Sequence, residues 1–338
     1  MGSSPELGPS GPFPHAPLVH ELDRRWLHYA FRSADGNVSV IANKSFLGAS
    51  GMRRERPQEM AILLVHDGRA GWQSSQFNAP VSDKPWSSFR HPGSPGRLRM
   101  QGQARTPLVD VNLSRTGRPC TSQCAPCGPG QHLRWQSEPG IVATGTVHTA
   151  RTMRSEVRML GYHERVRGRW TWPDLGGWVF GFCNAPVETG GPPPYSVVFT
   201  LVQPSRPDDA ATGSVMLWRR GRMIRHFPRR RIEVAVAGLL SRDRVHTCPP
   251  LSVTLGTPPT APVPKHLAIA ASLGADHLLI AMEAETAGRI VNPSESSLLP
   301  FSVHEVLGPC TVSGVVSGAE FTFTAGAIVE FAGGADGD

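Results

Sequence analysis

Three consecutive titratable residues, Tyr162, His163 and Glu164, are the strongest candidates in the sequence for acid–base chemistry. A phenol, an imidazole and a carboxyl group can each donate or accept a proton during a reaction. If the three lie on a β-strand, Tyr162 and Glu164 share one face and His163 takes the other, unless a bulge intervenes. The alternative is one buried, hydrogen-bonded ring and one surface carboxylate. We predict Tyr162, His163 and Glu164 as the catalytic residues.

Tryptophans follow this run closely. Trp170 and Trp172 are separated by one residue and so face the same side of a strand, and Trp178 has the same parity beyond a proline and two glycines. Trp26 and His28 share a face of an earlier predicted strand. Indoles at such positions either fill a barrel core or line a ligand cavity, where they stack on a polyene or stabilise a cation. These five residues are predicted to contact substrate.

His304 and Glu305 form a further candidate pair. Neighbours on a strand face opposite sides, so one could point into a cavity while the other packs at a domain junction. We predict both as substrate-binding, with a structural role as the alternative. Glu283 and Glu285 share strand parity near a loop and are predicted to form a solvated edge.

Three cysteines, Cys120, Cys124 and Cys127, have a spacing that occurs in iron–sulfur radical enzymes. Those enzymes need a barrel of alternating strands and helices, and helices are missing from the pattern here. With His132 the same cysteines could hold zinc. The surroundings favour a loop with reduced thiols, so we predict no metal. Cys183, Cys248 and Cys310 stand alone and are predicted in the core.

Composition limits the partners and the compartment. The chain has 338 residues, 39% hydrophobic and 18% charged, with a formal net charge of +7. The arginines that carry this charge are not interleaved with aromatic residues, so nucleic-acid binding is not predicted. No segment is long and apolar enough for a membrane anchor, and the first residues do not match a secretion signal. A cytoplasmic monomer or homodimer is expected.

Short β-prone segments joined by glycine-containing turns run through the whole chain. This sequence pattern predicts an all-β protein made of antiparallel barrels or sandwiches. The length suggests two domains. We predict a flexible segment over 1–19, one β domain over 20–190 and a second over 191–334, divided near the proline-rich residues 187–194. One short helix is predicted around residues 53–60, and no strict internal repeat is visible.

Two stretches resemble a known family. The first runs from Leu160-Gly-Tyr-His-Glu164 to Gly177-Trp-Val-Phe-Gly181, and the second from Phe301-Ser-Val-His-Glu-Val-Leu-Gly308 to Gly326-Ala-Ile-Val-Glu-Phe331. Together with the strand over 26–31 they resemble the hydroxyneurosporene synthase (carotenoid 1,2-hydratase) superfamily. The resemblance implies two lipocalin-like domains, and activity as a hydratase or as a cofactor-free cyclase, Diels–Alderases included. In the hydratases the Tyr-His segment is usually followed by an aspartate and a second histidine. Here Glu164 and Arg165 follow Tyr162 and His163, which favours a divergent member of the family.

Three functions follow as hypotheses. The first is a cofactor-free cyclase of polyketide-type biosynthesis, which folds an apolar polyene between the domains for a [4+2] cycloaddition or a cyclic-ether closure. The second is an alkene hydratase, in which a carboxyl such as that of Glu164 is kept protonated by an apolar site. The third is a carrier without catalysis, since lipocalin-like barrels hold apolar ligands. All three imply an apolar small-molecule partner, and no sequence motif for a nucleotide or flavin cofactor is present.

Overall fold

The computed structural model describes most of the chain. The described residues are 20, 22–48, 58–80, 88–89, 96–102, 105–121, 125–128, 130–170, 175–187, 191–204, 211–248, 262–293 and 300–334. Within them the backbone is almost entirely β-strand, and the only helices are two short 3-10 turns.

The strands of the first half run from Asp23 to Arg169. They are β1 (Asp23–Ser33), β2 (Val38–Leu47), β3 (Gln58–Asp67), β4 (Gly71–Pro80), β5 (Ser88–Phe89), β6 (Gly96–Gln101), β7 (Leu108–Ser114), β8 (Cys120–Thr121), β9 (Ala125–Gly128), β10 (Gln131–His148) and β11 (Met153–Arg169).

The strands of the second half follow from Leu175. They are β12 (Leu175–Asn184), β13 (Tyr195–Pro204), β14 (Thr212–Arg219), β15 (Arg222–Pro228), β16 (Ile232–Leu239), β17 (Val245–Thr247), β18 (Pro264–Leu273), β19 (Asp276–Glu283), β20 (Thr286–Pro293), β21 (Pro300–Val316) and β22 (Ala319–Gly334), with the 3-10 turns η2 (Arg229–Arg231) and η3 (Arg242–Arg244).

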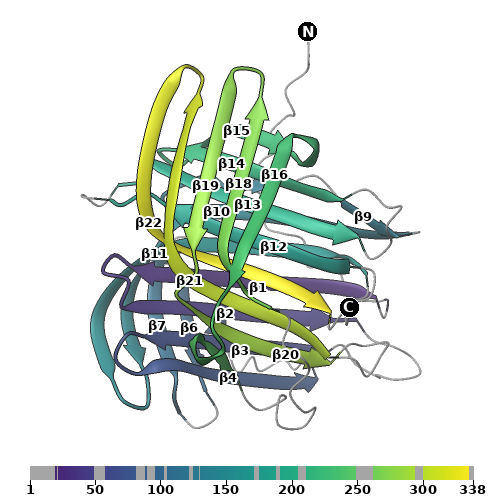
Figure 1. Cartoon of the computed structure of the whole chain (residues 1–338). Helices are drawn as coiled ribbons and strands as arrows, with labels where there is room; N and C mark the ends of the chain where they lie inside the picture. Colours follow the sequence, from purple (N-terminus) through teal and green to yellow (C-terminus); the bar gives the residue numbers. More distant parts are fainter. Residues whose placement is uncertain are drawn as a thin grey trace.

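These strands form two 11-stranded sheets. The first sheet has the order β4-β3-β2-β1-β11-β10-β7-β6-β5, and the second has the order β15-β14-β13-β12-β22-β21-β19-β18-β16. Pairing is antiparallel except for the short β17–β20 contact. Figure 1 shows the two curved sheets joined near the middle of the molecule, where β1, β11, β12 and β22 lie. The all-β fold with two tandem lipocalin-like domains is thereby confirmed.

The two sheet orders are the same when read strand by strand. Each sheet begins with a four-stranded meander, β4 to β1 in the first and β15 to β12 in the second. The last strand of the half, β11 or β22, pairs with the end of that meander. The strands that follow are β10-β7-β6-β5 in the first sheet and β21-β19-β18-β16 in the second. The chain therefore carries an internal repeat of topology that its sequence does not display. The changeover between the sheets lies between Arg169 and Leu175, and residues 191–194 fall between β12 and β13 of the second sheet.

Alternation of side chains explains why these segments become strands with two distinct faces. In β19, buried and exposed residues alternate over all eight positions. Sharp turns join many of the strands, as between β1 and β2, where Gly36 adopts a φ of 72° that favours glycine. The helix predicted around residues 53–60 is wrong over its last three residues, which begin β3; residues 51–57 lie outside the described residues.

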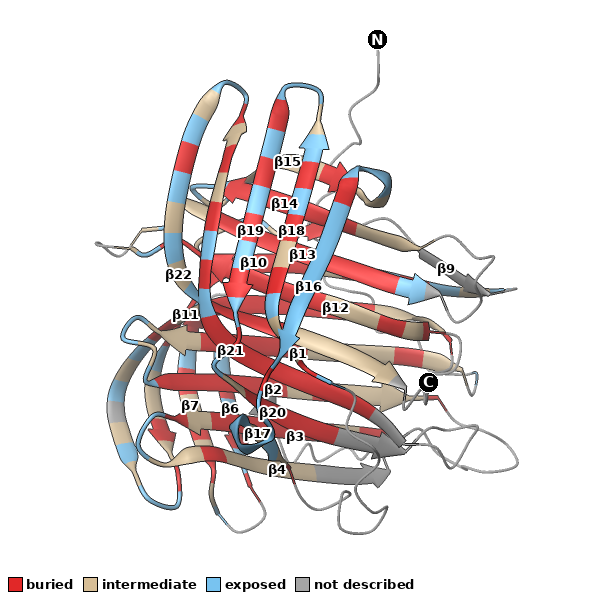
Figure 2. Ribbon diagram, in the orientation of Figure 1, coloured by how far each residue is buried: buried red, intermediate tan, exposed pale blue. Residues whose placement is uncertain are grey.

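Apolar side chains gather in three main layers. Figure 2 shows that buried residues run along the strands of both sheets. One layer lies inside the first sheet and contains Phe31 and Leu63. Another lies inside the second sheet and contains Phe199 and Cys310. The third lies between the sheets, combining residues of the first half, such as Tyr162, with residues of the second. This middle layer is the place where the two halves can build one site.

Among the residues that the structure describes, none belongs to a helix with the length and hydropathy needed to cross a bilayer.

Candidate functional site

The candidate site lies in the middle layer, on five strands whose registers bring glutamates together. In the first sheet His28 of β1 is opposite Glu164 of β11. In the second, Phe180 of β12 is opposite Glu330 of β22. Glu305 of β21 is the other neighbour of Glu330. Because strand faces alternate, these side chains point away from the two barrel interiors and toward each other.

Each half contributes an indole that donates a hydrogen bond to a glutamate. Trp26 Nε1 donates to Glu164 Oε1 over 3.0 Å, and Trp178 Nε1 donates to Glu330 Oε1. The two indoles stack, with ring centroids 6.5 Å apart and planes inclined by 25°. Trp170 packs edge-on against Trp26 at 5.4 Å. Two carboxyl groups are therefore oriented on either side of an aromatic wall.

The repeated topology makes these two elements equivalents of each other. Trp26 and Glu164 occupy in the first sheet the positions that Trp178 and Glu330 occupy in the second. The equivalents differ at two neighbouring positions, where Ser137 beside Glu164 corresponds to Glu305 beside Glu330, and His28 corresponds to Phe180. The two halves of the site therefore share one tryptophan and one glutamate at equivalent positions, and differ in the side chains beside each glutamate.

Glu305 and Glu330 are a cross-strand pair that shares a hydrogen bond. Burial raises the pKa of both carboxyl groups, and that of Glu305 is raised further by the negative charge of Glu330. Two ionised carboxylates in direct contact would repel each other strongly in an apolar interior. Glu305 therefore keeps a proton and donates it to Glu330, as in other buried carboxyl pairs that hold one proton between them.

Glu164 is a second buried acid. Burial raises the pKa of Glu164 to about 7, with the charge of Glu330 adding to the effect, while hydrogen bonds from Trp26 and Tyr162 act in the opposite direction. Tyr162 Oη donates to Glu164 Oε2 over 2.8 Å and lies 2.9 Å from Ser137 Oγ. Burial holds the pKa of the Tyr162 phenol well above its usual range, so this group stays a hydrogen-bond donor.

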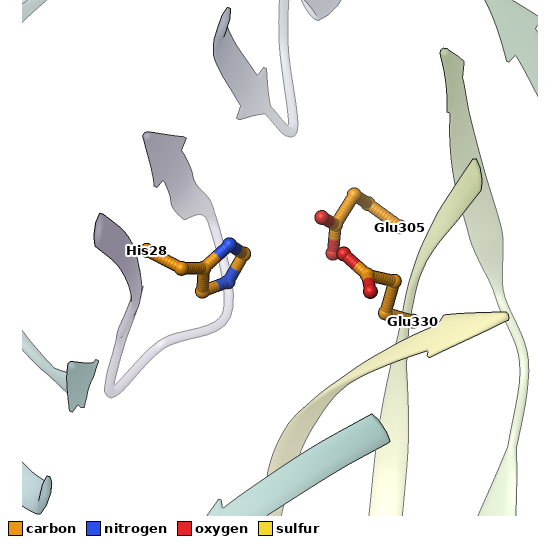
Figure 3. A group of neighbouring side chains, drawn as sticks. All are labelled: His28, Glu305 and Glu330. Carbon is orange, nitrogen blue, oxygen red and sulfur yellow. The ribbon is translucent and has the colours of Figure 1, made fainter. Parts of the chain in front are cut away.

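His28 faces the glutamate pair, as Figure 3 shows. Donor atoms of His28, Glu305 and Glu330 lie within 4.8 Å of one another, and this is the one such group of described residues that could hold a metal ion. A shared proton accounts for the close approach of the glutamates without a metal. Burial lowers the pKa of His28 to about 4, so its imidazole is neutral at pH 7.

Two small cavities flank this cluster, and Trp26, Glu164, Trp178 and Glu330 line both. The smaller, of about 30 Å³, is otherwise almost wholly apolar; it is also lined by Leu133, Trp135, Val166, Leu175, Phe180, Thr200 and Val202. The larger, of about 50 Å³, adds polar groups to apolar ones; it is also lined by His28, Ile41, Asn43, Ser45, Met60, Ile62, Ile290, Val303 and Glu305. The cluster thus lies between an apolar and a mixed compartment.

The structure brings five residues named from the sequence into this site. Trp26, His28, Glu164, Trp178 and Glu305 line the cavities, and Tyr162 supports Glu164 from behind. Trp170 reaches the site only through its contact with Trp26. Trp172 lies outside the described residues.

His163 and His304 point the other way, into the barrel interiors. The His163 ring stacks on Tyr29 at 4.0 Å, its Nδ1 lies 2.9 Å from the His28 backbone oxygen, and Arg165 Nε donates to its Nε2. His304 is opposite Arg289, and burial together with this positive charge lowers the pKa of His304 to about 4. Both contribute to the packing behind the site rather than to its surface.

The cysteine cluster is only partly visible. Cys120 is buried in the layer between the sheets, and His132 is exposed on β10. Cys124 and the side chain of Cys127 lie outside the described residues. Cys183, Cys248 and Cys310 are buried, as predicted, and form no disulfide, and Glu283 and Glu285 are exposed, as expected for a solvated edge.

Sequence reasoning missed Glu330 and Ser137 as site residues. Glu330 lies in the second resembling stretch, but it was not recognised as an acid because its partner Glu305 is 25 residues earlier in the chain. A usable signal was the pattern of tryptophan, any residue, aromatic ring, which occurs at Trp26 and Trp178 and also at Trp170. Two of its three occurrences lie on the two equivalent strands.

No protein-family model matches the sequence, and no curated protein matches it. Solved structures do match over nearly the whole chain. An AttH protein of Nitrosomonas europaea is 14% identical with a TM-score of 0.63, covering 97% of this chain and 98% of that one. Kievitone hydratase of Nectria haematococca is 10% identical with a TM-score of 0.55, covering 91% and 88%. CghA, solved with Sch210972, is 11% identical with a TM-score of 0.57, covering 94% and 90%.

At such low sequence identity, the likeness to these three structures is evidence for the fold alone. They share with this chain the arrangement of two β domains in tandem, which is the fold that the resemblance in the sequence implies.

Proposed function

We propose that this protein is a cofactor-free enzyme that protonates an alkene of an apolar small molecule and adds water to the resulting cation. The observation that carries the proposal is the cross-strand pair of the buried Glu305 and the half-buried Glu330 beside two stacked indoles, where burial raises the pKa of both carboxyl groups. A carboxylic acid kept neutral at pH 7 is the group that such a protonation requires.

The geometry supports each step of this reaction. The proton passes from Glu305 to one alkene carbon, and the positive charge develops on the other carbon. That cation is stabilised by the π faces of Trp26 and Trp178 and by the negative charge left on the glutamate pair. A water molecule then forms the new carbon–oxygen bond and releases one proton, which restores the acid. No electron transfer and no further reactant is needed.

A carrier does not need this arrangement. An apolar ligand is retained by apolar contacts, and a buried carboxyl group beside it costs stability without adding affinity. Three glutamates in one apolar interior are therefore better accounted for by proton transfer than by storage. The likeness in fold to kievitone hydratase agrees with a catalytic role for this kind of fold.

Ring closure is the second candidate. If the substrate carries its own hydroxyl group near the cation, that oxygen takes the place of water and a cyclic ether forms. The stacked indoles support it, because their π faces would stabilise the cation that the internal hydroxyl group captures. A [4+2] cycloaddition would use the same enclosure without a proton transfer. We place it behind the acid reactions because it leaves the protonated glutamate pair without a role.

The test uses two probes that end in a trisubstituted alkene, a prenylated phenol and lycopene. Each is incubated with the wild-type protein and with Glu305→Gln, and products are followed by mass spectrometry. We expect the mass of one water to be added to at least one probe by the wild type, and conversion to fall at least a hundredfold in the variant. An unchanged mass with a new retention time indicates ring closure. Conversion of neither probe, or equal conversion by both proteins, overturns the proposal.

A further inference from the structure

Two residues that line the larger cavity, His28 and Glu305, each have a buried polar atom that the described part of the chain leaves unsatisfied. His28 Nε2 makes no hydrogen bond there, and Glu305 Oε2 accepts none from an N–H group, because the hydrogen bond of this carboxyl group is the one it shares with Glu330. Both residues are only 2% exposed. Buried polar atoms of this kind are normally satisfied, because leaving them unpaired costs stability. Their place on the wall of one cavity therefore points to a small polar occupant.

The cavity has the size and lining for water. Its volume of about 50 Å³ exceeds the roughly 10–15 Å³ that one water molecule requires. Asn43 and Ser45 add further hydrogen-bonding groups on β2. A buried water needs between two and four polar partners, and this cavity offers that number. The smaller cavity has fewer polar groups on its wall, which are those of Glu164, Glu330 and Thr200, and His28 does not reach it.

We propose that the cavity lined by His28, Asn43, Ser45 and Glu305 holds the water molecule that the reaction consumes, and that His28 Nε2 takes the proton from this water as it attacks. This inference rests on the proposed function and assigns a role within it. Glu305, Trp26 and Trp178 line this same cavity, so a water held there lies beside the proposed acid and the indoles that stabilise the cation.

The proton balance closes within the cluster. The alkene carbon gains the proton of the Glu305–Glu330 pair, and the water oxygen bonds to the cationic carbon while its proton moves to His28 Nε2. The imidazolium then returns this proton to the glutamate pair, whose oxygens lie within 4.8 Å of it. Burial keeps the His28 ring neutral, so that Nε2 can accept a proton when the positive charge develops nearby.

The duplication of the site supplies the discriminating substitution. Phe180 holds in the second half the position that His28 holds in the first, and the two rings meet edge-to-face at 5.8 Å. His28→Phe therefore places in the first half the side chain that this fold already accepts in the second. His304→Phe is the matched control, because His304 is also buried, also has an unpartnered Nε2, and faces the barrel interior instead of the site.

The first experiment is independent of any substrate. Crystals of the wild-type protein and of His28→Phe are compared, and the wild type is also tested for bound metal by elemental analysis. We expect an ordered water within hydrogen-bonding distance of His28 Nε2 and of a Glu305 oxygen, and its loss in the variant. A dry cavity, or a metal ion at that position, overturns the inference and leaves the proposed acid reaction standing.

The second experiment separates protonation from water capture. The prenylated phenol is incubated in deuterated water and, separately, in water enriched in heavy oxygen. For His28→Phe we expect heavy-oxygen incorporation to fall at least tenfold while deuterium still enters the recovered alkene; His304→Phe should keep both. Wild-type hydration by His28→Phe, with its fold verified by thermal melting, overturns the role of His28. Loss of both labels in the wild type instead overturns the proposed function.

If His28→Phe does not fold, His28→Gln is measured in the same way. Its amide can still bond to water and takes up no proton, so the same divergence between the two labels is expected.

Discussion

Glu164, Glu305 and Glu330 share one apolar interior, and each negative charge there makes the next more costly. Burial is the largest cause of the raised pKa at all three, and charges within the cluster add to it at Glu164 and Glu305. The indole N–H groups of Trp26 and Trp178 act in the opposite direction on Glu164 and Glu330. The site is thus set to hold protons at neutral pH, and a positive charge that develops beside the glutamates favours release of one of them.

Replacing Glu305 by glutamine should separate stability from activity. The glutamine amide can still donate to Glu330, so the cross-strand hydrogen bond survives while the transferable proton is lost. We expect the melting temperature to stay the same or rise and the rate of prenylated phenol conversion to fall at least a hundredfold. Melting and conversion are measured on one preparation. A melting temperature that collapses along with the rate would assign Glu305 to structure.

Glu164 should make stability depend on pH in a defined direction. Burial raises its pKa from 4.5 to about 7, so between these values the folded protein holds a proton that the unfolded chain has lost. The contribution of Glu164 to the free energy of unfolding is fully present below pH 4.5 and is lost as the pH rises through 7. The shift corresponds to about 3 kcal/mol across that window.

Denaturant unfolding of the wild type and of Glu164→Gln at pH 5 and pH 8 measures this effect. The difference in unfolding free energy between the two proteins should change by about 3 kcal/mol in favour of the variant at the higher pH. Comparing the two proteins cancels the opposite contributions of His28 and His304, whose lowered pKa values favour the fold at higher pH. A difference that does not vary with pH would contradict the buried acid.

Chelation should leave the reaction intact. The donor atoms of His28, Glu305 and Glu330 are close enough to share a metal ion, yet the shared proton already stabilises the glutamate pair. Dialysis against a strong chelator is therefore expected to leave conversion of the prenylated phenol unchanged. Activity that disappears with the chelator and returns with one divalent metal would reassign the cluster.

At the residue scale, the sequence identified much of the site but not its arrangement. The alternation argument separates Tyr162 and Glu164 from His163, and the structure has that separation. Glu330 escaped because its importance depends on the register between β21 and β22, which places it opposite Glu305. Register is a long-range property, and a single sequence without an internal repeat does not display it.

At the scale of secondary-structure elements, two pairs of central strands position the site. β1 with β11 and β12 with β22 each present an indole and a carboxyl group on one face, while the opposite face packs into a barrel interior. Strand positions could be predicted because buried and exposed side chains alternate and turns contain glycine. The order of strands within each sheet could not, because it depends on which distant segments pair.

The indole of Trp178 should tune the acid rather than merely fill space. Its N–H lowers the pKa of Glu330, so Trp178→Phe should raise that pKa while retaining an aromatic ring. We expect the high-pH limb of the rate profile to move to higher pH. Trp218→Phe is the control, since its N–H donates to the backbone oxygen of Arg118, away from the glutamates. Equal profiles for the two variants would remove this role from Trp178.

On the scale of the whole molecule, polar bonds lock the sheets together around the apolar layer. Arg32 of the first sheet donates to the backbone oxygens of Gly308 and Ala327 over 3.1 and 3.3 Å. Trp72 Nε1 donates to Thr286 Oγ1 across the same junction. The proposed site needs this junction, because neither sheet alone holds both glutamate centres.

Removing Arg32 should loosen the junction measurably. Arg32→Met keeps much of the side-chain volume and removes both hydrogen bonds to the Gly308 and Ala327 carbonyl oxygens, which is expected to cost about 2 kcal/mol of unfolding free energy. Guanidinium unfolding gives this value. Arg97→Met, which breaks an exposed pair with Asp110, is the matched control and should not move the midpoint. Equal midpoints for both variants would show that Arg32 does not hold the sheets together.

The equivalence of Trp26 with Trp178 and of Glu164 with Glu330 also has a consequence for ancestry. A gene for one such sheet would encode half a site, and two copies in one reading frame would complete it. Selection can then change one half while the other preserves function. Descendants of that fusion should keep the tryptophan and the glutamate in both halves. They should differ from one another mainly at the two pairs of equivalent positions whose residues already differ here, Ser137 with Glu305 and His28 with Phe180.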